Sequence, residues 1–297
     1  LLVLPFIAWA IWAFFRRRGG RVAQAPQAWF WAILLALVTH PLLDAFTVYG
    51  TQLWWPLPVQ PTMWSTVFII DPLYTLWLLV ACVLAWAVPR RALAQRALVA
   101  GLVLSSVYLG WSVLAKTMVE RAAVAALAPI GLADAPRFSV PTPFNTVLWR
   151  VVVMTPGGYW IGDRSLIADR GPMRFQPHAS DMAALQAVAQ LPAVQRLAWF
   201  NHGFMRAQAR PAVRDAGPAS TTLPAPTQQL VLSDLRMGLE PAYTFNFGVA
   251  QRSAQGEWQA LTPPQRVATE PGNALSRDGI GPAWRAVWQR LWHEPKN

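Results

Sequence analysis

Residues 28–48 read AWFWAILLALVTHPLLDAFTV, an apolar run interrupted by one histidine and one aspartate. The run has about the 20 residues that a helix needs to cross a bilayer. Because backbone polar groups cannot stay unpaired in lipid, such a run predicts a transmembrane helix. Similar runs near residues 1–15, 66–88 and 97–118 predict an α-helical membrane domain with about four transmembrane helices.

The first of these runs begins at residue 1 and reads LLVLPFIAWAIWAFFRRR. A signal peptide carries its positive charge before the apolar core, whereas here the arginines follow it. We therefore expect residues 1–15 to be the remaining part of an incomplete first membrane helix whose beginning is missing.

The composition changes along the chain. Residues 1–129 hold nine Lys or Arg and only three acids, whereas residues 130–297 hold sixteen bases, eleven acids and many Pro and Gly. This change predicts a membrane domain over 1–129, a Pro-rich linker over 130–145 and a soluble α+β domain over 146–297.

Strand patterns dominate the predicted soluble domain. Apolar, β-branched runs predict strands near 146–154, 158–168, 196–200, 228–233 and 243–252. Apolar spacing predicts helices over 180–190 and 282–292, and Ala, Pro and Thr favour a long loop over 207–227. The apolar face of the last helix could dock on the domain or lie on the bilayer.

The distribution of arginines predicts the topology. Two loops are rich in arginine, and the loop between them has no Lys or Arg; the two clusters are Arg16, Arg17, Arg18 and Arg21, then Arg90, Arg91 and Arg96. Basic loops face the cytoplasm, so we expect a multi-pass protein of the bacterial inner membrane. The soluble domain is then expected on the outer side of the membrane, periplasmic or extracellular, and for an inner-membrane protein on the periplasmic side.

Charge and cysteine content exclude several classes of function. The net charge of +11 is mostly arginine, but no nucleic-acid motif accompanies it, so we expect no nucleic-acid partner. The single cysteine, Cys82, excludes a disulfide within the chain and a cysteine-based zinc site.

Ionisable side chains within the predicted spans are the first candidates for a functional site. His40 and Asp44 are four residues apart, which places them on one face of a helix. In the predicted topology Asp71 lies at the same membrane depth. An imidazole and two carboxylates suit a divalent metal, with zinc first and manganese or magnesium as alternatives. The structural alternative is that His40 bonds a backbone carbonyl and that Asp71 caps the helix beginning at Pro72.

Four further residues are candidates for supporting roles. Thr47 could orient a carboxylate or a substrate oxygen, and Gly50 would permit a turn or a close approach. Asn145 and Arg150 follow the proline-rich segment and are candidates for binding substrate, with helix or turn capping and surface charge as the alternative. No catalytic residue is assigned.

The segment HPLLDAFTVYGTQLWWP resembles the YdjM-type predicted membrane-bound metal-dependent hydrolases, with their His-x-x-x-Asp-x-x-Thr-x-x-Gly pattern and a following Trp-Pro pair. The matching positions are His40, Asp44, Thr47, Gly50, Trp55 and Pro56, and the later Asp71-Pro72 is also similar. The resemblance covers residues 1–120, and the second half is similar to a C-terminal extension of long members. The family usually has a histidine-containing block before the first helix, so further metal ligands are expected in a missing N-terminal segment.

The resemblance implies a metal-dependent hydrolase in which metal-activated water attacks an ester or phosphoester. Because the predicted site lies at the membrane surface, a lipid-linked or amphiphilic substrate and contact with membrane lipid are expected. The alternative is a non-enzymatic inner-membrane envelope protein with a periplasmic partner-binding domain.

Overall fold

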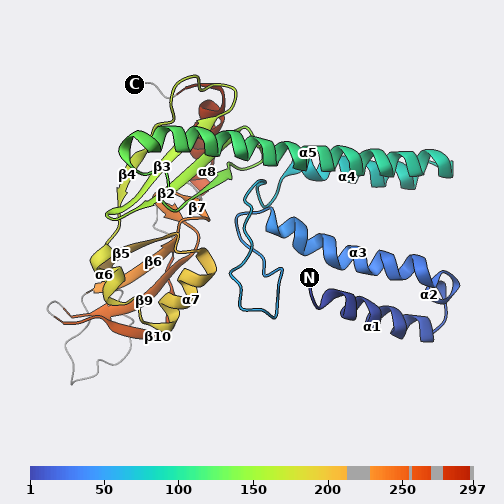
Figure 1. The fold of residues 1–297 in the computed structure, drawn as a ribbon, viewed down its shortest axis with the longest axis horizontal. Helices are drawn as coiled ribbons and strands as arrows, with labels where there is room; N and C mark the ends of the chain where they lie inside the picture. Colours follow the sequence, from blue (N-terminus) through green and yellow to red (C-terminus); the bar gives the residue numbers. More distant parts are fainter. Residues whose placement is uncertain (213–227, 254–255, 269–276, 295–297) are drawn as a thin grey trace.

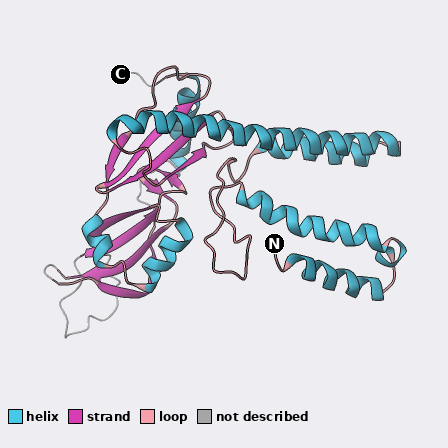
Figure 2. Cartoon of the chain, viewed as in Figure 1, coloured by secondary structure: helices cyan, strands magenta, loops and turns pink. Residues whose placement is uncertain are grey.

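The computed structural model describes residues 1–212, 228–253, 256–268 and 277–294. One long helix joins a helical part to a sheet-rich part (Figure 1). Among the described residues, every sheet lies in the second part (Figure 2). The expected order of a helical region followed by a sheet-rich domain is therefore confirmed.

The helical part contains α1 (Leu4–Arg17), α2 (Arg21–Gln24), α3 (Pro26–Ala45), α4 (Pro72–Ala87), α5 (Arg91–Leu127) and the 3-10 turn η1 (Ala128–Ile130). Helix α1 packs against α3, and α4 packs against α5. Two helical stretches, α3 and Arg91–Ile130, are long and apolar enough to cross a membrane, whereas α4 has 16 residues and α1 has 14.

Two helix boundaries differ from the sequence expectation, each for a local reason. Helix α4 begins at Pro72 and not near 66, because the Asp71 side chain caps it and Pro72 occupies its first turn. Helix α5 runs well past the expected end near 118. No proline occurs between Pro89 and Pro129, so nothing breaks the helix until it has reached the sheet-rich part.

The first sheet is antiparallel, with the order β1 (Arg137–Pro141), β2 (Leu148–Thr155), β3 (Gly158–Ser165) and β4 (Gln176–Ala179). Strand β1 lies within the segment expected to be a linker. Its register with β2 runs from the pair Arg137 and Val153 to the pair Pro141 and Trp149. The prolines of this segment fit a strand because β1 is at the edge of the sheet, where a missing N–H is tolerated.

The second half of α5 packs on one face of this sheet. Small and branched residues one turn apart meet alternate side chains of β2; the cluster contains Ala115, Val119, Ala123 and Leu127 of α5 with Trp149, Val151 and Val153 of β2. Because side chains alternate along a strand, the intervening residues of β2 face the other way. One uninterrupted helix thus belongs to the membrane hairpin with α4 and to the core of the sheet-rich part.

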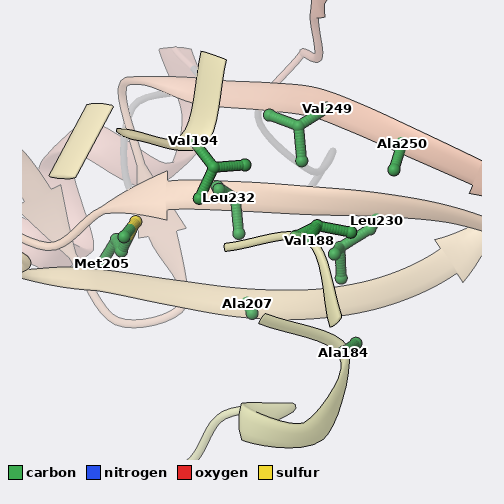
Figure 3. Packing of buried hydrophobic residues seen from close by; sticks show 9 residues of the cluster. All are labelled: Ala184, Val188, Val194, Met205, Ala207, Leu230, Leu232, Val249 and Ala250. Atoms are coloured by element: carbon green, nitrogen blue, oxygen red, sulfur yellow. The ribbon is translucent and has the colours of Figure 1, made fainter. Parts of the chain in front are cut away.

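The second sheet has the order β10 (Gln259–Arg266), β9 (Asn246–Arg252), β6 (Gln228–Asp234) and β5 (Met205–Pro211), with all pairs antiparallel. Helices α6 (Met182–Ala187) and α7 (Pro192–Asn201) lie beside it, and their apolar side chains share a core with its strands (Figure 3). The short hairpin of β7 (Gly238–Leu239) and β8 (Ala242–Tyr243) follows β6 in the chain.

The expected strand at 196–200 is wrong, because these residues lie in α7. Pro192 occupies the first turn of the helix, and Val194 packs with Leu197 and Ala198 in the core at helical spacing. Most of the long loop expected over 207–227 lies outside the described residues. In the part that the structure describes, the expectation is wrong, because residues 207–211 belong to strand β5 and pair with β6.

The C-terminal helix α8 (Arg277–Trp292) docks on the first sheet through its last turn. Leu291 is buried, and its carbonyl oxygen accepts a 2.7 Å hydrogen bond from the Ser165 hydroxyl. Arg290 forms an ion pair with Asp169. Docking on the domain is thus observed for Leu291, whereas Trp288 on the same predicted apolar face is 61% exposed.

Candidate functional site

His40 and Asp44 lie one turn apart on α3, as their spacing predicts. The distance from His40 Nε2 to Asp44 Oδ2 is 3.2 Å, and the two side chains are 72% and 51% exposed. The pair therefore occupies the surface of a helix that is apolar enough to cross a membrane.

Thr47 and Gly50 shape the turn that follows α3. The Thr47 hydroxyl donates a 2.7 Å hydrogen bond to the carbonyl oxygen of Asp44, which satisfies a carbonyl at the end of the helix. Gly50 has φ +93°, and a Cβ there would lie 3.1 Å from Pro61 Cβ and 3.6 Å from Arg236 Nη1. Both residues of the motif thus fix the backbone where it leaves the helix.

Asp71 is occupied by structural contacts. Its Oδ1 accepts hydrogen bonds from the backbone N–H groups of Leu73, at 3.0 Å, and Tyr74, at 3.3 Å. Its Oδ2 accepts a 2.9 Å hydrogen bond from the Tyr108 hydroxyl of α5. The capping alternative for Asp71 is therefore the observed one, and the same carboxylate joins α4 to α5.

The structure does not bring Asp71 together with His40 and Asp44 in a metal-holding group. Among the described residues, no set of three or more His, Cys, Asp or Glu side chains is placed to hold a metal ion. A catalytic zinc keeps three protein ligands, and the described pair supplies two. The described pair alone therefore falls one ligand short of the metal site that the sequence resemblance implies.

Arg236 connects the turn after α3 to the sheet-rich part. Its fully buried guanidinium pairs with Asp234 through Nε, at 2.9 Å from Oδ1, and Nη2, at 2.7 Å from Oδ2. Its Nη1 donates to the carbonyl oxygens of Tyr49, at 3.0 Å, and Phe200, at 3.2 Å. Sequence reasoning missed this residue, although an Asp-x-Arg pair within an apolar stretch could have marked it.

A second polar network holds α5 against β1. Lys116 donates to the carbonyl oxygen and the hydroxyl of Ser139, at 2.8 and 2.9 Å. The Ser139 hydroxyl donates to Glu120 at 2.6 Å, and Glu120 also pairs with Arg137 at 2.9 Å. Two cations, Lys116 and Arg137, thus share one carboxylate, Glu120, and all three side chains line an open recess of about 400 Å³.

A cavity of about 230 Å³ lies where the segment between α3 and α4 meets the first sheet and the β7–β8 hairpin. Val48, Phe68 and Ile69 contribute from the segment between α3 and α4. The sheet-rich part contributes Val140, Pro141, Thr142, Pro143, Arg150, Arg236, Met237, Gly238, Leu239, Ala242 and Thr244. A mostly apolar hollow with a few polar groups is typical of a small-molecule site.

Arg150 lines this cavity, whereas Asn145 organises a turn. The Asn145 side chain accepts hydrogen bonds from the backbone N–H groups of Val147, at 2.9 Å, and Leu148, at 2.8 Å, so it has the capping role. Arg150 is only 6% exposed, which excludes surface charge as its role. Of the two proposed substrate-binding residues, the structure brings only Arg150 to the cavity.

Comparison with known proteins gives a family match within the helical part of the chain. The chain matches none of the curated proteins and none of the solved structures with which it was compared. The family model described as YdjM inner membrane protein matches residues 1–119, the segment that carries His40, Asp44, Thr47, Gly50 and Asp71. The family resemblance seen in the sequence is thus confirmed over residues 1–119, which match the model of the YdjM inner membrane protein family.

Proposed function

We propose that this protein is a multi-pass inner-membrane protein whose C-terminal domain acts as a non-enzymatic binding module on the periplasmic side. In this proposal residues 1–129 form the membrane domain and residues 146–297 the soluble domain. The arginine-rich loops before α3 and before α5 support the orientation, because basic loops stay in the cytoplasm.

The observation that carries the proposal is the composition of the cavity wall. Phe68 and Ile69, immediately before the capped start of α4, face the same hollow as Arg150 and Met237 of the sheet-rich part. A ligand in this cavity would touch the membrane part and the sheets together. Such junctions between structural units are common places for small-molecule sites.

The chemistry of the wall supports binding more than catalysis. The described lining residues offer two arginines and two threonines but no His, Asp, Glu or Cys. General acid–base catalysis needs a group that titrates near neutral pH, and neither arginine nor threonine does. The ligand class we expect is a membrane lipid or another lipid-linked or amphiphilic molecule, since the cavity adjoins the ends of α3 and α4.

Native mass spectrometry of the full chain, released from membranes in a mild detergent, tests this proposal. We expect a fraction that retains one small molecule per chain. Ala242→Leu should remove that fraction because the larger side chain fills the cavity, whereas Ala183→Leu, at an exposed position of α6, should not. Equal retention by both variants contradicts a ligand site in this cavity.

The metal-dependent hydrolase implied by the family resemblance is the second candidate. The observation that favours it is the His40–Asp44 pair, an imidazole and a carboxylate 3.2 Å apart on a helix where ionisable groups are costly. Metal analysis of the purified full chain tests it. Bound zinc, manganese or magnesium that is lost in His40→Ala and in Asp44→Ala favours the hydrolase, and metal content unchanged in both variants contradicts it.

A further inference from the structure

Arg150 is a buried cation on the face of β2 that is turned away from α5. Val152, its neighbour on that face, belongs to the cluster with Phe138, Val140 and Tyr243, whereas Val151 packs toward α5. The Arg150 guanidinium therefore lies between the first sheet and the β7–β8 hairpin, where it reaches the cavity.

The hydrogen bonds of this guanidinium are incomplete. Its Nη2 donates to the carbonyl oxygen of Gly238. Its Nε is buried and has no hydrogen-bond partner among the described residues. A buried donor without an acceptor costs about 1–3 kcal/mol, and more when it is charged.

Its charge also lacks a direct ion pair, in contrast to the other two buried arginines of the described chain. Arg206 pairs with Glu240 at 2.8 Å, and Arg236 pairs with Asp234 at 2.7 Å. In the part of the chain that the structure describes, Arg150 has no such ion pair. Burial raises the pKa of its cross-strand neighbour Asp163, and the nearby Arg150 charge offsets part of that rise, so the two attract each other without direct pairing.

The cavity supplies the place for the missing anion. None of the described residues that line it is acidic, and Asp163, the cross-strand partner of Arg150, is not among them. Because buried charges need a partner, the geometry favours a ligand with a carboxylate or phosphate group that Arg150 can hold.

The other residues that line the cavity indicate the chemical nature of the rest of the ligand. Phe68, Ile69, Val140, Met237 and Leu239 make most of the hollow apolar. A volume of about 230 Å³ is smaller than the roughly 300–1,000 Å³ of cavities that enclose a whole drug-sized ligand. The cavity therefore suits the charged end and the first carbons of a longer chain.

We propose that Arg150 is the anion-binding residue of a site for an anionic amphiphile, with the head group on the guanidinium and the chain leaving past Phe68 and Ile69. This inference rests on the binding module proposed above and names its ligand class. The bilayer delivers such a ligand directly, because Phe68 and Ile69 precede the start of α4.

Equilibrium binding of radiolabelled dodecyl phosphate to the full chain in nanodiscs of zwitterionic lipid tests the inference, with protein-free nanodiscs as background. We expect one saturable site that unlabelled dodecanoate competes for and inorganic phosphate does not. Arg150→Met should weaken binding about tenfold or more, the effect of one lost charged hydrogen bond. Arg150→Lys should retain part of the affinity, and Arg196→Met, which removes an exposed charge from α7, should retain all of it.

The contrary outcomes separate the two proposals. Wild-type affinity in Arg150→Met, together with loss of binding in Ala242→Leu, overturns the anion assignment and leaves the binding module in place. Competition by inorganic phosphate as strong as that by dodecanoate assigns the site to a free anion and overturns the amphiphile. If neither dodecyl phosphate nor dodecanol binds saturably to the wild-type chain, both proposals fail.

Discussion

Arg236 Nη1 donates a 3.0 Å hydrogen bond to the carbonyl oxygen of Tyr49, a residue 187 positions earlier in the chain. Tyr49 belongs to the turn after α3, and Arg236 follows strand β6 of the second sheet. This contact joins the turn after α3 to the sheet-rich part at a place separate from α5. Arg236 thus adds a buried link between the two parts besides the continuous helix α5.

We predict that Arg236→Met destabilises the protein by about 3–5 kcal/mol, because it leaves Asp234 buried without its partner. Thermal unfolding of the full chain in detergent measures this effect. Arg150→Met is the matched comparison, since it removes a buried arginine that has no ion pair in the described chain. We expect Arg150→Met, without ligand, to leave the stability unchanged or to raise it. Equal losses of stability in the two variants would contradict the claim that only Arg236 is held by an ion pair in the described chain.

The contact between α4 and α5 gives a second prediction. A Cβ at Gly101 would lie 2.4 Å from Ala81 Cβ and 2.7 Å from the carbonyl oxygen of Trp77. Gly101→Ala should therefore push the helices apart and cost about 1–3 kcal/mol in the same unfolding measurement. Gly110 lies on the same helix with no atom within 4 Å of its added Cβ, so Gly110→Ala should be neutral or gain up to about 1 kcal/mol. Equal effects of the two substitutions would show that this packing is absent.

Asp71 and the His40–Asp44 pair should respond differently to substitution. Asp71→Ala removes the cap of α4 and the acceptor of the Tyr108 hydroxyl, and should cost about 1–3 kcal/mol. His40→Ala breaks an exposed pair and should change stability by less than about 1 kcal/mol. Differential scanning fluorimetry compares them, and a larger loss for His40→Ala than for Asp71→Ala would be evidence against the structural role of Asp71.

Alkaline pH should weaken the core between the sheets. Burial and the hydrogen bond to Glu240 raise the pKa of Tyr159 to about 12, above its ordinary value of 10.0. Because the folded state holds the Tyr159 proton more tightly than the unfolded state does, protonated Tyr159 stabilises the fold. This stabilisation is complete below pH 10 and is lost as the pH rises through 12. Unfolding measured between pH 8 and 12 should show this loss in the wild type and a smaller loss in Tyr159→Phe. Identical pH profiles would exclude Tyr159 as the source.

Local patterns allowed part of this structure to be predicted. The spacing of His40 and Asp44 is enough to place both on one face of α3, and the Asp71-Pro72 pair is enough to suggest a capped helix. The contact between Arg236 and Tyr49 was not predictable, because no local pattern relates positions so far apart. A metal-holding group that contains His40, Asp44 and Asp71 is not found among the described residues, and equal membrane depth does not specify which helices are neighbours.

The position of Arg150 was predictable from the sequence only in part. Its place in a strand follows from the apolar, β-branched residues around it, and strand periodicity puts it on the face opposite Val151. Only the fold shows that this face meets the β7–β8 hairpin and the turn before α4. The strand expected at 196–200 was wrong because a short apolar run does not by itself distinguish a strand from a helix.

In the proposed function, the cavity beside Arg150 opens on the periplasmic side and holds an anionic amphiphile. Labelling of a single cysteine in intact spheroplasts tests both properties. In a Cys82→Ser background, Thr244→Cys puts a thiol on the cavity wall and Gln95→Cys puts one on the exposed, predicted cytoplasmic end of α5. We predict that a membrane-impermeant maleimide labels Thr244→Cys without permeabilisation, that dodecyl phosphate slows this labelling, and that Gln95→Cys reacts only after permeabilisation. Labelling of Gln95→Cys but not Thr244→Cys in intact spheroplasts, or a Thr244→Cys rate unaffected by dodecyl phosphate, would contradict the account.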